Sequence, residues 1–287
     1  MPRSRKPLIG VTGATGYLGS SLVSTLRARS VGVVEYRRTV LDENDATVRQ
    51  LDLSQPIESS LFSGVTCLVH AAWDLVETDS RRAWELNVAG SKRVIESALE
   101  AGVRRVIFVS SMSAYFGTTQ AYGLMKLAVE RTVLESDQIV VRPGLVYGEH
   151  SGGMAETLAK LARLPIIPIF RGAQQFTLHI DDFLSAMSTL VLSKDVPSAV
   201  IGLANESPVS FKELMLSLTP AANGAARTVV VPWPALLTLL RVGEKLRVPL
   251  PVRSDSLLGL VRPAPNVPGR DVATAMGLSF RPYTIGP

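Results

Sequence analysis

The sequence predicts an α/β protein with a doubly wound parallel sheet, on three observations. Over the first half of the chain, short runs rich in Val, Ile and Leu alternate with longer segments of helical periodicity, as in strand–helix–strand units. Within each run the apolar residues are nearly continuous, which indicates strands covered on both faces. A glycine-rich turn also joins the first strand to the first helix.

The strands of the expected sheet follow one another along the first half of the chain. They are residues 8–12, 31–36, 48–51, 65–70, 105–110 and 138–142. A crossover helix is expected over residues 84–101, where apolar residues recur at helical spacing and Gly102 is a natural stop. A second helix is expected over residues 127–135.

The glycine-rich turn has the form of a phosphate-binding loop, Thr12-Gly13-Ala-Thr-Gly16-Tyr-Leu-Gly19. Gly13 permits a tight bend, Gly16 lets the backbone approach a pyrophosphate, and Gly19 lets the helix pack closely on the sheet. The spacing differs from G-x-G-x-x-G, but the strand before the turn and the helix after it fit a dinucleotide fingerprint. We therefore expect a Rossmann-type domain with a cofactor that contacts Gly13, Thr15, Gly16, Tyr17, Leu18 and Gly19.

The second half of the chain has a different pattern. From about Tyr147 it becomes less regular and richer in proline, so we expect a dinucleotide-binding domain over residues 1–150 and a smaller C-terminal substrate lobe over residues 151–287. Residues 199–203 have the pattern of a strand, which either belongs to the lobe or rejoins the main sheet. The leucine-rich segment 234–246 is expected to pack in the core or to form a substrate lid, with peripheral membrane contact as the minor alternative.

Composition and charge exclude several classes of protein. With 287 residues, of which 46% are hydrophobic and 19% charged, the chain has the composition of a globular protein. Apart from Arg3, Arg5 and Lys6, the basic residues are scattered among acids, so no surface for nucleic acid is expected. No apolar run approaches the roughly 18 residues of a transmembrane helix.

The cysteine and histidine residues are too few or too dispersed for disulfide or metal chemistry. Cys67 is the single cysteine, so no intrachain disulfide is expected and the reducing cytoplasm is the expected location. The chain enters its first strand too early for a signal peptide. His70, His150 and His179 have no metal-ligand spacing, so no metal site is expected, and His70 is expected to be structural.

Tyr122 and Lys126 are the strongest candidates for catalysis. They are four residues apart where a helix is expected to begin, which places both side chains on one face. A phenol with an ordinary pKa of about 10 is a poor base at neutral pH, but a neighbouring ammonium group stabilises the phenolate and lowers that pKa. Ser110, Ser111 and Ser113 lie at the end of the fifth strand, shortly before this pair.

Together these motifs resemble the extended short-chain dehydrogenases/reductases, often called the NAD-dependent epimerase/dehydratase family. The resemblance covers at least residues 8–182 and rests on the glycine turn, the Ser-Ser strand end and the Tyr-x-x-x-Lys pair. It implies that Tyr122 exchanges a proton with the substrate oxygen, and that Ser111 polarises that oxygen, with Ser113 as the alternative. It also implies cofactor contacts by Asp52, Leu53, Ala71, Ala72, Tyr122, Lys126 and Pro143.

The end of the second strand selects the cofactor in that family. An acidic residue there holds the ribose diol of NAD, whereas a basic residue holds the 2′-phosphate of NADP. A gap-free count from the glycines places Arg37 at this position, with Arg38 beside it and Glu35 two residues early. The resemblance therefore favours NADP over NAD, with a pair of solvated arginines as the alternative interpretation.

The resemblance also suggests roles for two polar residues outside these motifs. Asn87 lies on the crossover helix, where it either orders water near the cofactor or is an exposed polar residue. His179 precedes a later helix, and a plain N-cap role is at least as well supported as a functional one.

The expected function is that of an NAD(P)-dependent oxidoreductase or epimerase that transfers hydride at a carbonyl or alcohol centre. The resemblance suggests a nucleotide sugar as substrate, and Arg37 and Arg38 favour a ketoreductase. A dehydratase is less favoured, because Met112 and Ser113 stand where such relatives place Asp-Glu. The alternatives are an NAD-dependent sugar-nucleotide epimerase, a dehydrogenase of steroids or other apolar alcohols, and a non-catalytic cofactor-binding subunit. A homodimer is implied by analogy with extended relatives.

Overall fold

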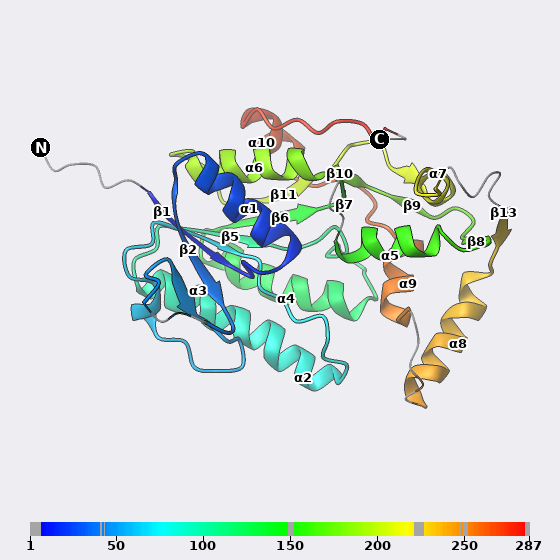
Figure 1. Ribbon diagram of the computed structural model, residues 1–287, viewed down its shortest axis with the longest axis horizontal. Coiled ribbons are helices and arrows are strands. Elements are labelled where there is room, and N and C mark those ends of the chain that lie inside the picture. The colour runs from blue at the N-terminus through cyan, green and yellow to red at the C-terminus, as the bar shows by residue number, and fades with distance from the viewer. Residues whose placement is uncertain are drawn as a thin grey trace, which may run out of the picture.

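A seven-stranded parallel sheet forms the centre of the computed structural model (Figure 1). The structure describes residues 7–40, 42, 44–148, 152–220, 227–246, 248 and 252–284. The spatial order is β11-β6-β5-β4-β1-β2-β3. The strands are β1 (Leu8–Thr12), β2 (Gly32–Arg37), β3 (Val48–Gln50), β4 (Cys67–His70), β5 (Arg105–Val109), β6 (Ile139–Pro143) and β11 (Val200–Leu203). The predicted parallel sheet is therefore confirmed. Arg3, Arg5, Lys6 and His150 lie outside the described residues.

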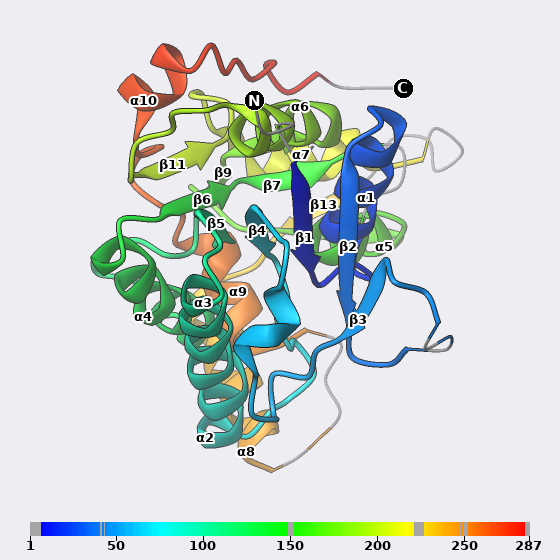
Figure 2. The same cartoon turned by 90° about the vertical axis from the view of Figure 1, so that its left-hand side faces the viewer.

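Helices cover both faces of this sheet, as Figures 1 and 2 show. On one face pack α1 (Tyr17–Ala28), α6 (Ile180–Leu192) and α10 (Arg270–Ala275). On the other pack α3 (Gly90–Glu100) and α4 (Ala121–Glu135). The strands between them are almost wholly buried, which explains their continuous apolar runs. The doubly wound arrangement is confirmed.

The crossover to β5 is one long helical segment with a π-helical turn in it. It consists of α2 (Ser80–Trp84), η2 (Glu85–Ala89) and α3, after the 3₁₀ turn η1 (Ser59–Phe62). The π-helical turn carries Asn87, which is buried. The expectation that Asn87 is an exposed polar residue is therefore wrong.

The C-terminal part of the chain builds a separate apolar cluster beside the sheet. Its helices are α5 (Gly153–Leu161), α7 (Phe211–Ser217), α8 (Trp233–Lys245) and α9 (Ser254–Val261), and its core contains Leu158, Phe211, Leu240 and Leu258. Three short strand pairs accompany them: β7 (Leu145–Tyr147) with β10 (Thr177–His179), β8 (Ile166–Ile169) with β13 (Arg227–Val230), and β9 (Gln174–Gln175) with β12 (Val209–Ser210).

Strand β11 connects this region back to the main sheet. It pairs with β6 along its whole length, with Val200 opposite Val140 and Leu203 opposite Pro143. The chain thus leaves the sheet after β6 and returns to it before the last helices. The domain division between residues 150 and 151 remains a prediction.

Candidate active site

The glycine turn lies at the carboxyl end of β1 and opens directly into α1. Gly13 has a positive φ of 67°, and a side chain there would come within 2.8 Å of the backbone of Ala71 and Ala72. Gly16 stands at the N-cap of α1 without a side-chain cap. The glycine at position 13 lets the turn lie directly against the Ala71-Ala72 backbone, and the first turn of a helix presents backbone amides that suit a pyrophosphate. The predicted cradle of residues 13–19 thus fits a dinucleotide.

Thr12 holds the turn after β4 in place. Its hydroxyl oxygen accepts hydrogen bonds from the backbone amides of Ala71 and Ala72, each at 3.1 Å, and lies 2.7 Å from Nδ1 of His70. Because the oxygen already accepts two bonds, its own hydrogen is left to donate to Nδ1. Burial lowers the pKa of His70 to about 3, so the ring is neutral at physiological pH. This agrees with the structural role expected for His70.

Asp74 and Asn87 fix the loop that follows this turn. The Asn87 side chain accepts a hydrogen bond from the Asp74 amide at 2.7 Å and donates one to the Asp74 carbonyl at 2.9 Å. The Asp74 carboxylate in turn accepts from the amides of Val76 and Glu77 and from the Arg38 guanidinium at 3.1 Å. Asn87 therefore acts on the site through the backbone of the loop.

The two arginines at the end of β2 are both engaged by carboxylates. Arg37 donates two hydrogen bonds to the buried carboxylate of Glu35, which also pairs with Arg27 at 2.7 Å. Glu35 thus lies between two cations and is not exposed for a ribose diol. Arg38 pairs with Asp74 but keeps two thirds of its side chain exposed. Of the two residues, Arg38 is the more accessible to an anionic ligand.

The remaining expected cofactor residues lie along the same carboxyl edge of the sheet. Asp52 accepts hydrogen bonds from the amide and hydroxyl of Ser54, and the amide bond most strongly lowers its pKa. Leu53 is buried in the core with its carbonyl bonded to Arg93, so its side chain is not at the surface. Pro143 ends β6 and accepts a hydrogen bond from Met112.

Ser111 and Tyr122 meet through their side chains. Burial raises the pKa of Tyr122 to about 12, and the neighbouring Ser111 hydroxyl acts in the opposite direction. The phenol is therefore protonated at neutral pH. The Ser111 hydroxyl also accepts a hydrogen bond from the Ser113 amide at 3.1 Å. The structure thus brings Ser111, rather than Ser113, to the candidate tyrosine.

Gly123 allows this meeting, because it lets the start of α4 lie against the serine loop. A side chain at Gly123 would overlap the carbonyl of Ser113 and reach within 3.0 Å of the Thr118 hydroxyl. Position 123 must therefore be glycine, which has no side chain.

Lys126 is enclosed by aromatic rings on the same face of α4. Its ammonium group lies 3.7 Å from the centre of the Trp73 ring, 4.7 Å from that of Phe108 and 5.7 Å from that of Tyr122. It donates a hydrogen bond to the carbonyl of Val109 at 2.8 Å. Burial lowers the pKa of Lys126 to about 7, against the opposite effect of the Glu130 carboxylate. Its proton is thus available near neutral pH.

Glu130 forms a buried polar cluster one turn further along α4. Its carboxylate accepts a hydrogen bond from the Ser110 hydroxyl and two from the Arg142 guanidinium, at 2.9 and 2.5 Å. This cluster connects the ends of β5 and β6 to the helix that carries Tyr122 and Lys126. The negative charge of Glu130 raises the pKa of Lys126 and so partly offsets the effect of burial.

Asp255 connects the C-terminal region to the candidate tyrosine. This residue of α9 accepts hydrogen bonds from the backbone amides of Ala121 at 2.7 Å and Tyr122 at 3.1 Å. Gln120, the N-cap residue of α4, provides no side-chain cap of its own. The helix begins at Ala121, directly before the Tyr122–Lys126 segment that was expected to open it, and a carboxylate from elsewhere in the chain satisfies its first amides.

Sequence reasoning missed Trp73, Glu130 and Asp255. Glu130 was detectable in principle, since it lies four residues after Lys126 on the same predicted helix. Trp73 follows the Ala71-Ala72 turn that was assigned to the cofactor. Asp255 had no such signal, because its contact with Tyr122 spans 133 residues of sequence.

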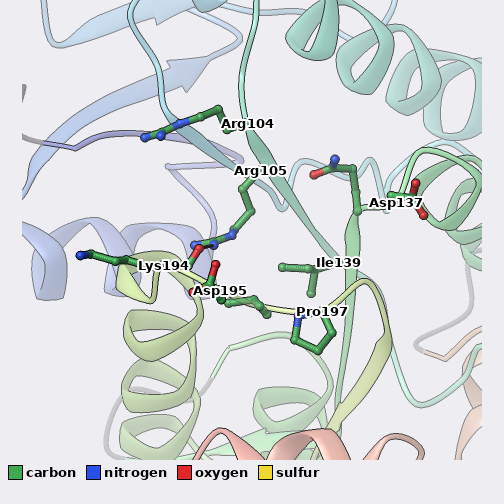
Figure 3. A pocket seen from close by; sticks show the side chains of 9 residues that line it. Arg104, Arg105, Asp137, Ile139, Lys194, Asp195 and Pro197 are labelled. Atoms are coloured by element: carbon green, nitrogen blue, oxygen red, sulfur yellow. Dashed lines mark hydrogen bonds between the residues drawn. The ribbon is translucent and has the colours of Figure 1, made fainter.

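A hollow on another part of the surface contains none of these residues. Figure 3 shows it near the amino ends of β5 and β6, and it is lined by Arg104, Arg105, Asp137, Gln138, Ile139, Lys194, Asp195, Val196 and Pro197. Arg105 donates to the carbonyls of Leu190, Ser193 and Lys194, which end α6. Its guanidinium therefore has a structural role at a helix C-terminus.

A family model, that of the NAD dependent epimerase/dehydratase family, matches residues 9–202. The chain belongs to this family. As a member of this family, the protein is an NAD(P)-dependent enzyme. It is 28% identical to the ceramide reductase of Caulobacter vibrioides over 261 residues, which cover 83% of this chain and 78% of the relative.

Two other members illustrate the range of the epimerase/dehydratase family. The chain is 24% identical to the UDP-glucose 4-epimerase of Vibrio cholerae over 268 residues, 81% of this chain and 80% of that protein. The structure of MoeE5 in complex with UDP-glucuronic acid and NAD superposes with a TM-score of 0.72 at 22% identity, covering 96% of this chain and 94% of that one. That superposition confirms the Rossmann-type fold.

The described part of the chain contains no group of three or more His, Cys, Asp or Glu residues arranged to hold a metal ion. Among these residues, too, no helix is long and apolar enough to cross a membrane.

Proposed function

We propose that this enzyme is an NAD(P)H-dependent ketoreductase, in which Tyr122 donates a proton to the oxygen of a substrate carbonyl. The observation that carries the proposal is the position of the Ser111 hydroxyl beside the Tyr122 phenol, close enough to act on the pKa of Tyr122, with the Lys126 ammonium 5.7 Å from the centre of the Tyr122 ring. Two hydroxyl groups that converge in this way can both bond to one substrate oxygen. Burial raises the pKa of Tyr122 to about 12, so the phenol is the proton donor that reduction requires.

The surrounding residues support the proton transfer. When bound, the nicotinamide supplies the hydride. Ser111 holds the substrate oxygen beside Tyr122, and the Lys126 ammonium stabilises the phenolate left behind when the proton has moved. Trp73 and the Val109 carbonyl keep that ammonium in place. Asp74 and Asn87 maintain the loop that carries Trp73.

We propose NADP as the cofactor. Glu35 is buried between Arg27 and Arg37, which leaves it unsuited to hold a ribose diol. Arg38 is largely exposed at the same strand end and offers a cation to a 2′-phosphate. The 2′-phosphate would displace the single hydrogen bond between Arg38 and Asp74.

An apolar carbonyl compound is the substrate class that the structure favours over the nucleotide sugar expected from the sequence. The loop that begins at Trp73, which contacts Tyr122, continues into exposed Leu75 and Val76. Side chains of this kind suit an aliphatic or steroid substrate better than a sugar diphosphate. The ceramide reductase relative supports this choice, whereas the UDP-glucuronic acid in MoeE5 supports a nucleotide sugar.

The test is oxidation of NADPH and NADH by the purified enzyme with three substrate groups: steroid ketones, long-chain aliphatic ketones and 4-keto nucleotide sugars. NADPH oxidation with the apolar ketones is expected. Oxidation with nucleotide sugars alone would overturn the substrate class, and epimer formation without net oxidation would overturn the reductase. Tyr122→Phe should abolish turnover and retain cofactor binding. Tyr36→Phe is the matched control, because that hydroxyl donates to the Leu61 carbonyl and not to a residue of the candidate site.

A further inference from the structure

Helix α8 presents an apolar stripe to the surface. Its buried side packs against α9 through Leu237 and Leu240. On the opposite side Leu239, Val242 and Leu246 are 67%, 50% and 70% exposed. They are separated by three and four residues, so they lie in one line along the helix. Figure 1 shows α8 at the margin of the molecule, away from the central sheet.

The exposed charges beside this stripe are positive. Arg241 and Lys245 are exposed on α8 next to the apolar line. The only acidic residue of the helix, Glu244, is turned inward, where its carboxylate accepts hydrogen bonds from the amide and hydroxyl of Ser254 at 2.7 and 2.6 Å. The helix therefore presents leucine, valine and cations outward while its carboxylate is used to cap α9.

A second group of exposed apolar residues lies near α2. Trp84 is 47% exposed, and the exposed charges around it are of both signs, Arg81 and Arg82 with Asp79 and Glu85. The loop before the helix contributes Leu75 and Val76. In Figures 1 and 2 the α2 helix and the C-terminal end of α8 both lie at the lower end of the molecule, on the side of the sheet covered by α3 and α4.

We propose that this edge, formed by α8 and the α2 region, binds the surface of anionic lipid membranes. A helix with exposed leucines on one side and cations on the next lies in the plane of a membrane interface, where apolar side chains enter the acyl boundary and Lys and Arg meet the headgroups. A tryptophan flanked by arginines has the same preference. On α8 the exposed charges, Arg241 and Lys245, are positive and Glu244 is engaged by Ser254, which complements anionic headgroups, so we take the lipid surface as the occupant.

The proposal goes beyond the reductase activity and does not depend on it. Membrane binding is measured without substrate or cofactor. Failure of the protein to bind vesicles would therefore leave the proposed reductase activity untouched, and failure of the reductase assay would leave the membrane proposal untouched. If both are correct, an apolar substrate reaches the enzyme from the membrane to which the enzyme is bound.

The experiment is co-sedimentation with vesicles of phosphatidylcholine alone and of phosphatidylcholine with roughly one third phosphatidylglycerol. The wild-type chain is expected to bind the anionic vesicles and to dissociate at high salt, because the headgroup attraction is screened. Leu239→Glu with Leu246→Glu should weaken binding at least about tenfold, since two leucines that would be buried in the acyl boundary on binding are lost. Arg241→Gln with Lys245→Gln should weaken it on anionic vesicles specifically.

Leu192→Glu is the matched control, because Leu192 is an exposed leucine at the end of α6 on the other face of the sheet. It should bind vesicles as the wild type does. Absence of vesicle binding, equal binding to the uncharged vesicles, or equal loss in the control would each overturn the proposal. A concentration-dependent dimer that Leu239→Glu and Leu246→Glu abolish, without vesicle binding, would identify a second copy of the chain as the occupant instead.

Discussion

Asp255 accepts a hydrogen bond from the backbone amide of Tyr122 at 3.1 Å, across 133 residues of sequence. The carboxylate replaces the missing N-cap of α4 and fixes the tyrosine at the first turn of its helix. The position of the candidate proton donor therefore depends on the C-terminal region, and four consequences of this and of neighbouring contacts can be measured.

Asp255→Asn should lower kcat about fivefold with little change in KM for the cofactor. An amide can accept one of the two backbone bonds but not both, and loss of a cap costs about 1 kcal/mol. The same substitution removes a negative charge that raises the pKa of Tyr122, so the alkaline limb of the kcat profile should move to lower pH. Glu213→Gln is the control, because Glu213 caps α7 and makes no contact with α4. An equal decrease of kcat in the two variants would mean that Asp255 only stabilises the fold and does not position Tyr122.

Arg37→Ala combined with Arg38→Ala should weaken NADPH binding by about 1 to 3 kcal/mol more than NADH binding. The reason is that a 2′-phosphate loses its cationic partners, whereas the diol of NADH has none to lose. Binding is measured by titration of the cofactor fluorescence. Arg27→Ala also removes a partner of Glu35, but at the end of α1, and it should leave the ratio of the two affinities unchanged. An equal weakening of both cofactors would remove the case for NADP.

Glu130→Gln should destabilise the enzyme by about 3 to 5 kcal/mol, because it leaves the Arg142 guanidinium buried beside an uncharged partner. Glu130 is 3% exposed, whereas Glu135 on the same helix is 61% exposed and pairs with Arg131 at the surface. Glu135→Gln should therefore cost less than about 0.5 kcal/mol. Urea unfolding of the two variants gives the comparison. Similar losses would mean that the cluster of Ser110, Glu130 and Arg142 is not structural.

The free energy of unfolding should rise between pH 7 and pH 9, and Lys126→Met should remove most of this rise. Burial lowers the pKa of Lys126 from 10.5 to about 7, so in this window the unfolded lysine holds a proton that the folded one has released. Folding is then favoured as pH increases. His70 titrates below this window and Tyr122 above it, whereas Cys67, whose pKa burial raises from 9.0 to about 12, opposes the rise only near pH 9. Lys160→Met, at an exposed lysine, should leave the rise intact.

The fold was predictable because the sheet is encoded locally. Each predicted strand of the parallel sheet is present within two residues at either end, and the glycine turn is placed between β1 and α1 as expected. Parallel strands buried on both faces require continuous apolar runs, and such runs are visible without any knowledge of tertiary contacts. The strand at residues 199–203 was also detectable, but its pairing with β6 depends on a long return of the chain.

The candidate site was predictable in part. Ser111, Tyr122 and Lys126 form a recognisable pattern along the chain, and the structure brings them together. Trp73 and Asp255 act through contacts that no spacing encodes, and the ion pairs of Arg37 and Arg38 depend on where Glu35 and Asp74 are folded. Sequence reasoning counted these arginines as free cations, whereas in the structure each has a carboxylate partner.

Gly123 sets a limit for anyone who wishes to redesign this enzyme for other substrates. Any larger residue would push the first turn of α4 away from the Ser113 carbonyl and would carry the phenol with it. Libraries that diversify the residues around Tyr122 should therefore keep position 123 constant, and new specificity is better sought in Leu75 and Val76, where side chains are exposed.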